Sequence, residues 1–87
     1  MMEYKVLIKL YVPEIEKNYE MYIPINKTVS QVNTLINRLI NNITNGVYPI
    51  KNKVYLYNRK TSELYSDSIA IRNTDIRNGT ELVLDSK

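Results

Sequence analysis

The stretch TVSQVNTLINRLINNITNG, residues 28–46, decides the fold. Its apolar residues recur at spacings of three and one, which places them on one side of an α-helix. They are Val29, Val32, Leu35, Ile36, Leu39, Ile40 and Ile43. Thr28 and Gln31 predict a capping box at the start of this helix, and Gly46 can supply a left-handed residue just past its end. We expect the apolar ridge to be buried as a whole.

The other side of this predicted helix is polar. It carries Ser30, Asn33, Thr34, Asn37, Arg38, Asn41 and Asn42. β-Branched residues and asparagines have poor helix propensity, so packing must hold the helix in place. We expect the polar side to be solvated, with a hydrogen-bonding interface as the alternative.

Two segments before the helix alternate between apolar and other residues. They are EYKVLIKLYV (3–12) and YEMYIPI (19–25), and this period of two predicts strands. The polar loop between them predicts an antiparallel hairpin. Pro24 lacks a backbone N–H, which favours an edge position or the end of the second strand.

The chain beyond the helix predicts two more strands, KVYLY (53–57) and TELVLD (80–85). LYS (64–66) is at best a short strand. Residues 66–80 are irregular, with Ile69, Ile71 and Ile76 as anchors and a turn at Asn78-Gly79.

This order predicts an α+β fold, in which one helix packs on one face of a mixed four- to five-stranded sheet. The 87 residues predict a single domain spanning 1–87. No apolar run approaches the roughly 20 residues of a membrane span. We expect a cytoplasmic protein, and attachment to the inner face of a membrane through a partner stays open.

Composition argues against catalysis. The chain has no Cys and no His, so the common nucleophile–base pairs are missing. Two Gly residues cannot build a glycine-rich phosphate loop, and the acidic residues lack the spacing of metal ligands. We therefore expect no enzyme activity, no cofactor and no metal. The net charge of +3 is spread along the chain, so we expect no nucleic acid as partner.

The chain resembles ubiquitin and its β-grasp relatives over nearly its whole length. In AIRNTDIRNGTELVL (70–84), Ile71 and Ile76 match two turn anchors, and Leu82 and Leu84 match inward positions of the last strand. Conjugated modifiers and sulfur carriers of this fold end in Gly-Gly. This chain ends Leu84-Asp85-Ser86-Lys87, so we expect no conjugation unless a longer precursor exists.

A more specific resemblance is to the YukD-like proteins, ubiquitin-fold proteins of Gram-positive bacteria associated with type VII (ESAT-like) secretion. It rests on YEMYIPINKTVSQVNTLINRLINNI (19–43) and on the closing Gly79 with Leu82 and Leu84. The resemblance implies a non-catalytic accessory or regulatory protein. It also implies a protein partner, such as a membrane component or the ATPase of the secretion apparatus. In some relatives a similar domain is the cytosolic part of a membrane component.

The open face of the predicted sheet is the candidate partner-binding surface. Its residues are Leu7, Tyr11, Tyr22, Tyr55, Tyr57 and Val83. In the usual β-grasp strand order, Tyr22, Leu7, Val83 and Tyr55 would form one apolar band, on the sheet face that ubiquitin uses for most partners.

Other interpretations of this face stay open. The tyrosines could serve only to stabilise strands. Together with Lys5 and Lys9 they could form a generic adaptor or a weak single-stranded nucleic-acid site. Pairing of edge strands into a homo-oligomer also stays open.

Overall fold

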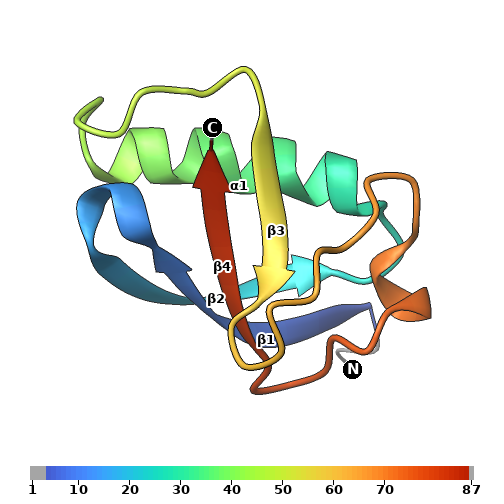
Figure 1. Ribbon diagram of the computed structural model, residues 1–87. Helices are drawn as coiled ribbons and strands as arrows, with labels where there is room; N and C mark the ends of the chain where they lie inside the picture. The colour runs from blue at the N-terminus through green and yellow to red at the C-terminus, as the bar shows by residue number, and fades with distance from the viewer. Residues whose placement is uncertain (1–3, 87) are drawn as a thin grey trace.

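A computed structural model describes residues 4–86 (Figure 1). This part of the chain contains, in order, β1 (Lys5–Val12), η1 (Pro13–Ile15), β2 (Lys17–Pro24), α1 (Val29–Ile43), β3 (Val54–Asn58), η2 (Ile71–Asn73) and β4 (Glu81–Ser86). The predicted helix and the four long strands are all present. The predicted short strand at 64–66 is reduced to one bridge between Leu64 and Tyr57. Glu3, predicted to begin the first strand, lies outside the described residues.

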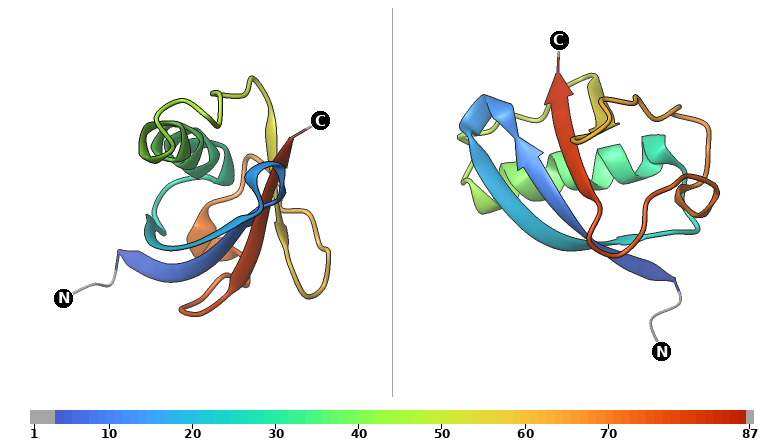
Figure 2. Two further views of the ribbon diagram at one scale, coloured as in Figure 1. Left: turned by 90° about the vertical axis from the view of Figure 1, so that its left-hand side faces the viewer. Right: turned by 60° about the horizontal axis from the view of Figure 1, so that its bottom comes forward.

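The four strands form one mixed sheet in the order β2-β1-β4-β3. β1 pairs in parallel with β4, whereas β1–β2 and β3–β4 are antiparallel. α1 crosses one face of the sheet, and the two views of Figure 2 show that the described elements leave the opposite face without a helix. β2 is an edge strand that ends at Pro24, as the missing N–H of proline predicts.

The core lies between α1 and the sheet. The strands contribute to it the apolar residues of their inner face, namely Ile8, Leu10, Val12, Ile23, Val54, Leu56, Leu82 and Leu84. Ile71 and Ile76 close the core from the irregular segment, as predicted, whereas Ile69 is exposed. Burial of each such side chain stabilises the fold by roughly 1.5–3 kcal/mol before chain entropy is counted.

The buried face of α1 is narrower than the sequence predicts. Val29, Val32, Ile36 and Ile40 are fully or almost fully buried. In contrast, Leu35, Leu39 and Ile43 are 49%, 42% and 52% exposed. The prediction that all seven apolar residues form one buried ridge is therefore wrong for these three.

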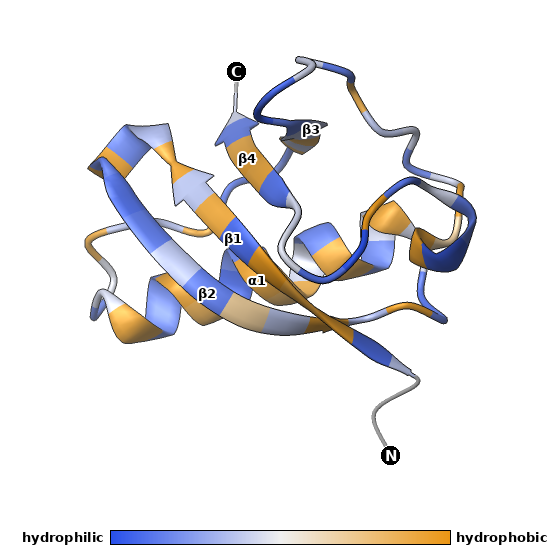
Figure 3. Cartoon of the chain, turned by 90° about the horizontal axis from the view of Figure 1, so that it is seen from below, coloured by the Kyte–Doolittle hydropathy of each residue, from blue (hydrophilic) through white to orange (hydrophobic). Residues whose placement is uncertain are grey.

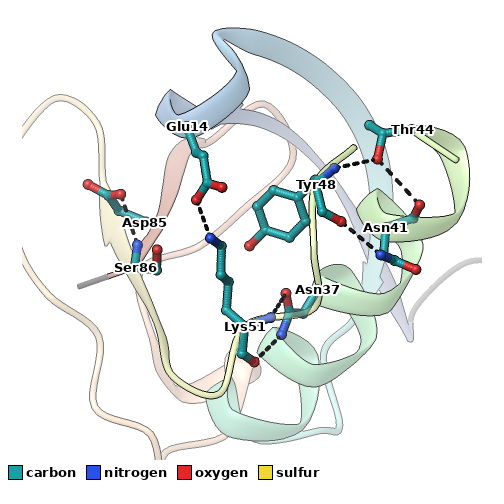
Figure 4. A network of polar contacts seen from close by, with 8 residues as sticks. All are labelled: Glu14, Asn37, Asn41, Thr44, Tyr48, Lys51, Asp85 and Ser86. Carbon is teal, nitrogen blue, oxygen red and sulfur yellow. Dashed lines mark hydrogen bonds and ion pairs between the residues drawn. The ribbon is translucent and has the colours of Figure 1, made fainter. Parts of the chain in front are cut away.

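Asparagines on the opposite flank of α1 explain this orientation (Figure 4). The Asn37 amide donates to the carbonyl of Lys51 at 2.7 Å and accepts from the N–H of Lys51 at 3.2 Å. Asn41 donates to the carbonyl of Tyr48 at 2.8 Å. Residues 47–53 are thus fastened alongside the helix, which buries Asn33 and Asn37 instead of leaving them solvated. These bonds turn the asparagine flank of α1 inward, so the other flank, with Leu35, Leu39 and Ile43, is turned away from the core.

The start of α1 has the predicted capping box. The Thr28 hydroxyl accepts from the N–H of Gln31 at 3.2 Å, and the Gln31 side chain accepts from the N–H of Thr28 at 2.9 Å. Thr28→Ala should therefore lower the free energy of unfolding by about 1 kcal/mol, measured by urea denaturation. Thr34→Ala, at an exposed position in the same helix, is the control and should change it by less. Equal effects of the two substitutions would show that the cap contributes nothing.

Candidate protein-binding surfaces

The open face of the sheet separates the predicted site residues into two groups. Leu7 on β1 faces Tyr22 on β2. Four residues further along β1, which is about 13 Å in a strand, Tyr11 faces Val83 on β4, and Val83 faces Tyr57 on β3. The predicted band of Tyr22, Leu7, Val83 and Tyr55 is therefore not continuous, because the register places Val83 beside Tyr11 rather than Leu7.

Val83 offers little surface to a partner in this structure, because only 4% of it is exposed. It lies in the row between Tyr11 and Tyr57. The guanidinium of Arg59 lies over the Tyr11 ring, 4.7 Å from its centroid, and donates to the Asn18 side chain at 3.2 Å. This end of the face is thus partly covered by the protein's own side chains. A role in binding for Leu7, Tyr11, Tyr22, Tyr55, Tyr57 and Val83 remains a prediction.

The charges on this face alternate in sign. Lys9 faces Glu20 on β2 and Glu81 on β4. Figure 3, which colours the chain by hydropathy, shows hydrophilic and apolar segments alternating along β1 and β2. Carboxylates on both sides of Lys9 oppose the basic stripe that a nucleic-acid backbone requires.

An open groove of about 450 Å³ lies beside the outward tyrosines of β3. Tyr55, Tyr57 and Leu64 supply its apolar lining, and Asp85 and Ser86 supply its polar lining. Two predicted residues, Tyr55 and Tyr57, thus line a common depression on the sheet.

The helix carries an apolar surface that the sequence analysis assigned to the core. Leu35, Leu39 and Ile43 lie four residues apart, so they form one column along α1; they are called the leucine column below. Each is about half exposed, although all three are large apolar side chains. Asn37 and Asn41 hold residues 47–53 against the other flank of α1, so the column lies on the flank away from this loop.

A tyrosine–carboxylate network closes the loop after β3, away from the leucine column. The Tyr65 hydroxyl donates to Asp75 Oδ1 at 2.6 Å and accepts from Asn58 Nδ2 at 3.2 Å. Burial, together with the bond to Asp75, raises the pKa of Tyr65 to about 12. A phenol with so high a pKa is a poor general acid or base near neutral pH, so the network has a structural use.

Neither a metal centre nor a membrane span is found among residues 4–86. No three His, Cys, Asp or Glu residues in this range are grouped so that they could hold a metal ion. No helix in it has the length and the apolar character to cross a bilayer.

Comparisons with known proteins support the fold. No protein-family model and no curated protein matches the chain. Among solved structures, the chain is similar to part of a chain in the MycP5-free ESX-5 inner membrane complex, with a TM-score of 0.75 and 14% identity. That match covers 93% of this chain but only 20% of the other.

Two further structures match over nearly the full length of both chains. Caldiarchaeum subterraneum ubiquitin has a TM-score of 0.64 and 14% identity, covering 95% of this chain and 94% of its own. A chain of the toluene 4-monooxygenase HD complex with the inhibitor 4-bromobenzoate has a TM-score of 0.73 and 8% identity, covering 95% and 99%. At such identities the likeness concerns the fold alone. The protein has an α+β, ubiquitin-like β-grasp fold.

Proposed function

We propose that this protein is a non-catalytic protein-binding module that acts as an accessory or regulatory component of a type VII secretion system. The observation that carries the binding role is the leucine column, three large apolar side chains held half exposed on one rigid helix. Contiguous exposed apolar surface on a small protein commonly marks an interaction site.

The leucine column suits a partner better than the sheet face does. Its side chains stand on regular helix turns whose buried side is fixed by Ile36 and Ile40, so little order has to be created on binding. On the sheet, Val83 is buried and Arg59 lies over Tyr11. Leu7 and Tyr22 remain there as a smaller second surface.

Two independent observations support the secretion context. The sequence resembles the YukD-like proteins, and the fold matches part of a chain from the MycP5-free ESX-5 inner membrane complex. We propose that the protein works in the cytoplasm and docks on an ATPase or a membrane component of such an apparatus. The alternative is a generic ubiquitin-like adaptor with the same leucine column and an unrelated partner.

Titration calorimetry against purified cytosolic domains of the secretion ATPase and membrane components of the same organism tests this function. The triple variant Leu35→Asp, Leu39→Asp, Ile43→Asp should weaken binding by about tenfold or more, because each carboxylate would be desolvated in the interface. Ser30→Asp with Thr34→Asp adds two charges at exposed positions of α1 away from the leucine column and should leave binding unchanged.

The other outcomes separate the alternatives. If Leu7→Asp with Tyr22→Asp abolishes binding and the triple variant does not, the sheet face is the binding surface. If no secretion component binds the folded wild-type protein, the secretion role is wrong. A steep, salt-dependent affinity for oligothymidylate would instead favour a nucleic-acid site.

A further inference from the structure

A second depression lies on the flank of α1 opposite the leucine column. It is a groove of about 370 Å³ between the helix and the segment that leads into β3. It is lined by Ser30, Asn33, Thr34, Asn37, Arg38, Ile50, Lys51, Asn52, Lys53, Val54 and Asp67. Most of these residues are polar, although apolar atoms make up the larger part of the lining surface, so the groove offers a ligand both hydrogen bonds and apolar contacts.

Asn33 is the unusual residue of this groove. It is only 5% exposed, yet its Oδ1 has no hydrogen-bond partner among the described residues. A buried amide oxygen without a partner destabilises a fold, and such atoms are rare. Rotation about the bond to the amide carbon exchanges the oxygen with the NH₂ group, so either can be turned toward the groove.

The neighbouring asparagines indicate what Asn33 is suited to hold. Asn33, Asn37 and Asn41 are spaced by four residues and form one column along α1. Asn37 binds both the N–H and the C=O of one residue, Lys51, and Asn41 binds the C=O of Tyr48. Figure 4 shows these two amides reaching the loop backbone from successive turns. The Oδ1 of Asn33, one turn earlier, accepts no hydrogen bond from the described part of the loop.

The edge of β3 that faces away from β4 has, within residues 4–86, unpaired backbone groups beside the groove. Further along this edge, the carbonyl of Leu56 accepts a hydrogen bond from the N–H of Tyr65 at 3.0 Å. Val54, two residues earlier in the strand, directs its backbone groups to that same side. Among the described residues, no segment pairs with Val54 there. An extended chain in the groove could thus reach both Val54 and Asn33.

The charge of the groove favours an acidic occupant. Its lining includes Arg38, Lys51 and Lys53 but a single carboxylate, Asp67. Asp67 is paired with Lys53 at 2.8 Å, and Lys51 is paired with Glu14 at 2.7 Å. The Arg38 guanidinium has no ion-pair partner among the described residues and is exposed. Complementary charge steers the encounter and sets specificity.

We propose that this groove binds a short, extended, acidic segment of a partner protein. Asn33 binds one backbone group of that segment, through the amide atom that is turned toward the groove. The free edge of Val54 pairs with the same segment, and Arg38 attracts its carboxylates. This site is separate from the leucine column, so it stands or falls independently of the proposed function.

NMR titration with the peptide acetyl-Asp-Val-Asp-Val-Asp-amide tests the proposal. We expect a dissociation constant of about 1 mM. The NMR chemical shifts of the Asn33 side-chain amide and of the Val54 backbone amide should change as peptide is added. Asn33→Leu should weaken binding by about tenfold. It should not lower the thermal midpoint, because it removes an unpaired buried amide. Asn42→Leu, at an exposed position of the same helix, is the matched control and should change nothing.

Several results would overturn the proposal. They are the absence of shifts at Asn33 and Val54, equal affinity of the Asn33→Leu variant, and equal binding of acetyl-Lys-Val-Lys-Val-Lys-amide. Shifts in the groove with free acetate or phosphate, at the same concentration, would indicate a small-anion site instead. Shifts that grow with protein concentration alone would indicate that a second copy of the chain is the occupant.

Discussion

Replacing Ile36 by alanine is expected to lower the free energy of unfolding by about 2–5 kcal/mol, whereas the same change at Leu35 should lower it by less than about 1 kcal/mol. Ile36 is only 2% exposed and packs in the core between α1 and the sheet. Truncating it leaves a cavity in addition to the lost burial. Leu35, its neighbour in the chain, faces water and leaves no cavity.

Urea denaturation of the two variants and the wild-type protein measures this difference directly. Both residues belong to the same predicted apolar ridge, so the sequence alone predicts similar effects. Leu39→Ala and Ile40→Ala form a second matched pair with the same expected contrast. Similar losses within each pair would mean that α1 is rotated relative to the sheet in solution.

The second large effect is expected in alkaline solution. The pKa of Tyr65 is about 12 in the folded protein, against an ordinary value of 10.0. The folded state therefore holds this proton more tightly than the unfolded state. The resulting stabilisation of about 2–3 kcal/mol is fully present below about pH 10. It is lost as the pH rises from about 10 to about 12.

A comparison of the wild-type protein with Tyr65→Phe isolates this contribution. Tyr65→Phe also removes the hydrogen bond to Asp75, so it should be less stable near neutral pH. Its stability deficit should shrink steadily above about pH 10, because phenylalanine has no proton to lose. Titration of lysines and of Tyr48, whose pKa is also raised by burial, cancels in the difference. A deficit that stays constant across this range would contradict the assigned pKa.

Local patterns predict the elements of this fold well. The alternation in KVLIKLYV follows from one solvent-exposed and one buried face of the sheet, and the capping box needs only Thr28 and Gln31. These features depend on neighbours in the chain, so the sequence displays them. The need of the apolar helix face for a cover predicts a sheet, whereas its strand order, which the structure confirms, follows from the resemblance to the β-grasp proteins.

The sequence patterns do not predict which face of α1 is turned toward the sheet. Leu35 and Ile36 are equally apolar, and nothing in their spacing tells which of them is buried. The deciding contacts come from Asn37 and Asn41, whose amides bind backbone groups of a loop that has no periodic pattern. The spacing of these asparagines by four residues is the only signal in the sequence for their contacts with the loop. Asparagines at such positions are more often solvated.

The predicted continuity of the apolar band on the sheet is wrong because of the strand register. The parity of each strand correctly places Leu7, Tyr11, Tyr55, Tyr57 and Val83 on one face. Parity does not tell which residues lie beside one another, because sliding β4 by two residues along β1 preserves it. The pairing of Tyr11 with Val83 moves Leu7 to the other end of the face. The burial of Val83 then follows from its two tyrosine neighbours.

The place of β4 constrains how the protein is made. It is the last described element along the chain, yet it lies between β1 and β3 in the sheet. While a ribosome is still extending the chain, β1 and β3 have no strand to join them, and the inner side chains Ile8 and Leu56 stay uncovered. The native sheet can close only after residues 81–86 have been synthesised. Until then the nascent chain exposes the apolar surface that chaperones bind.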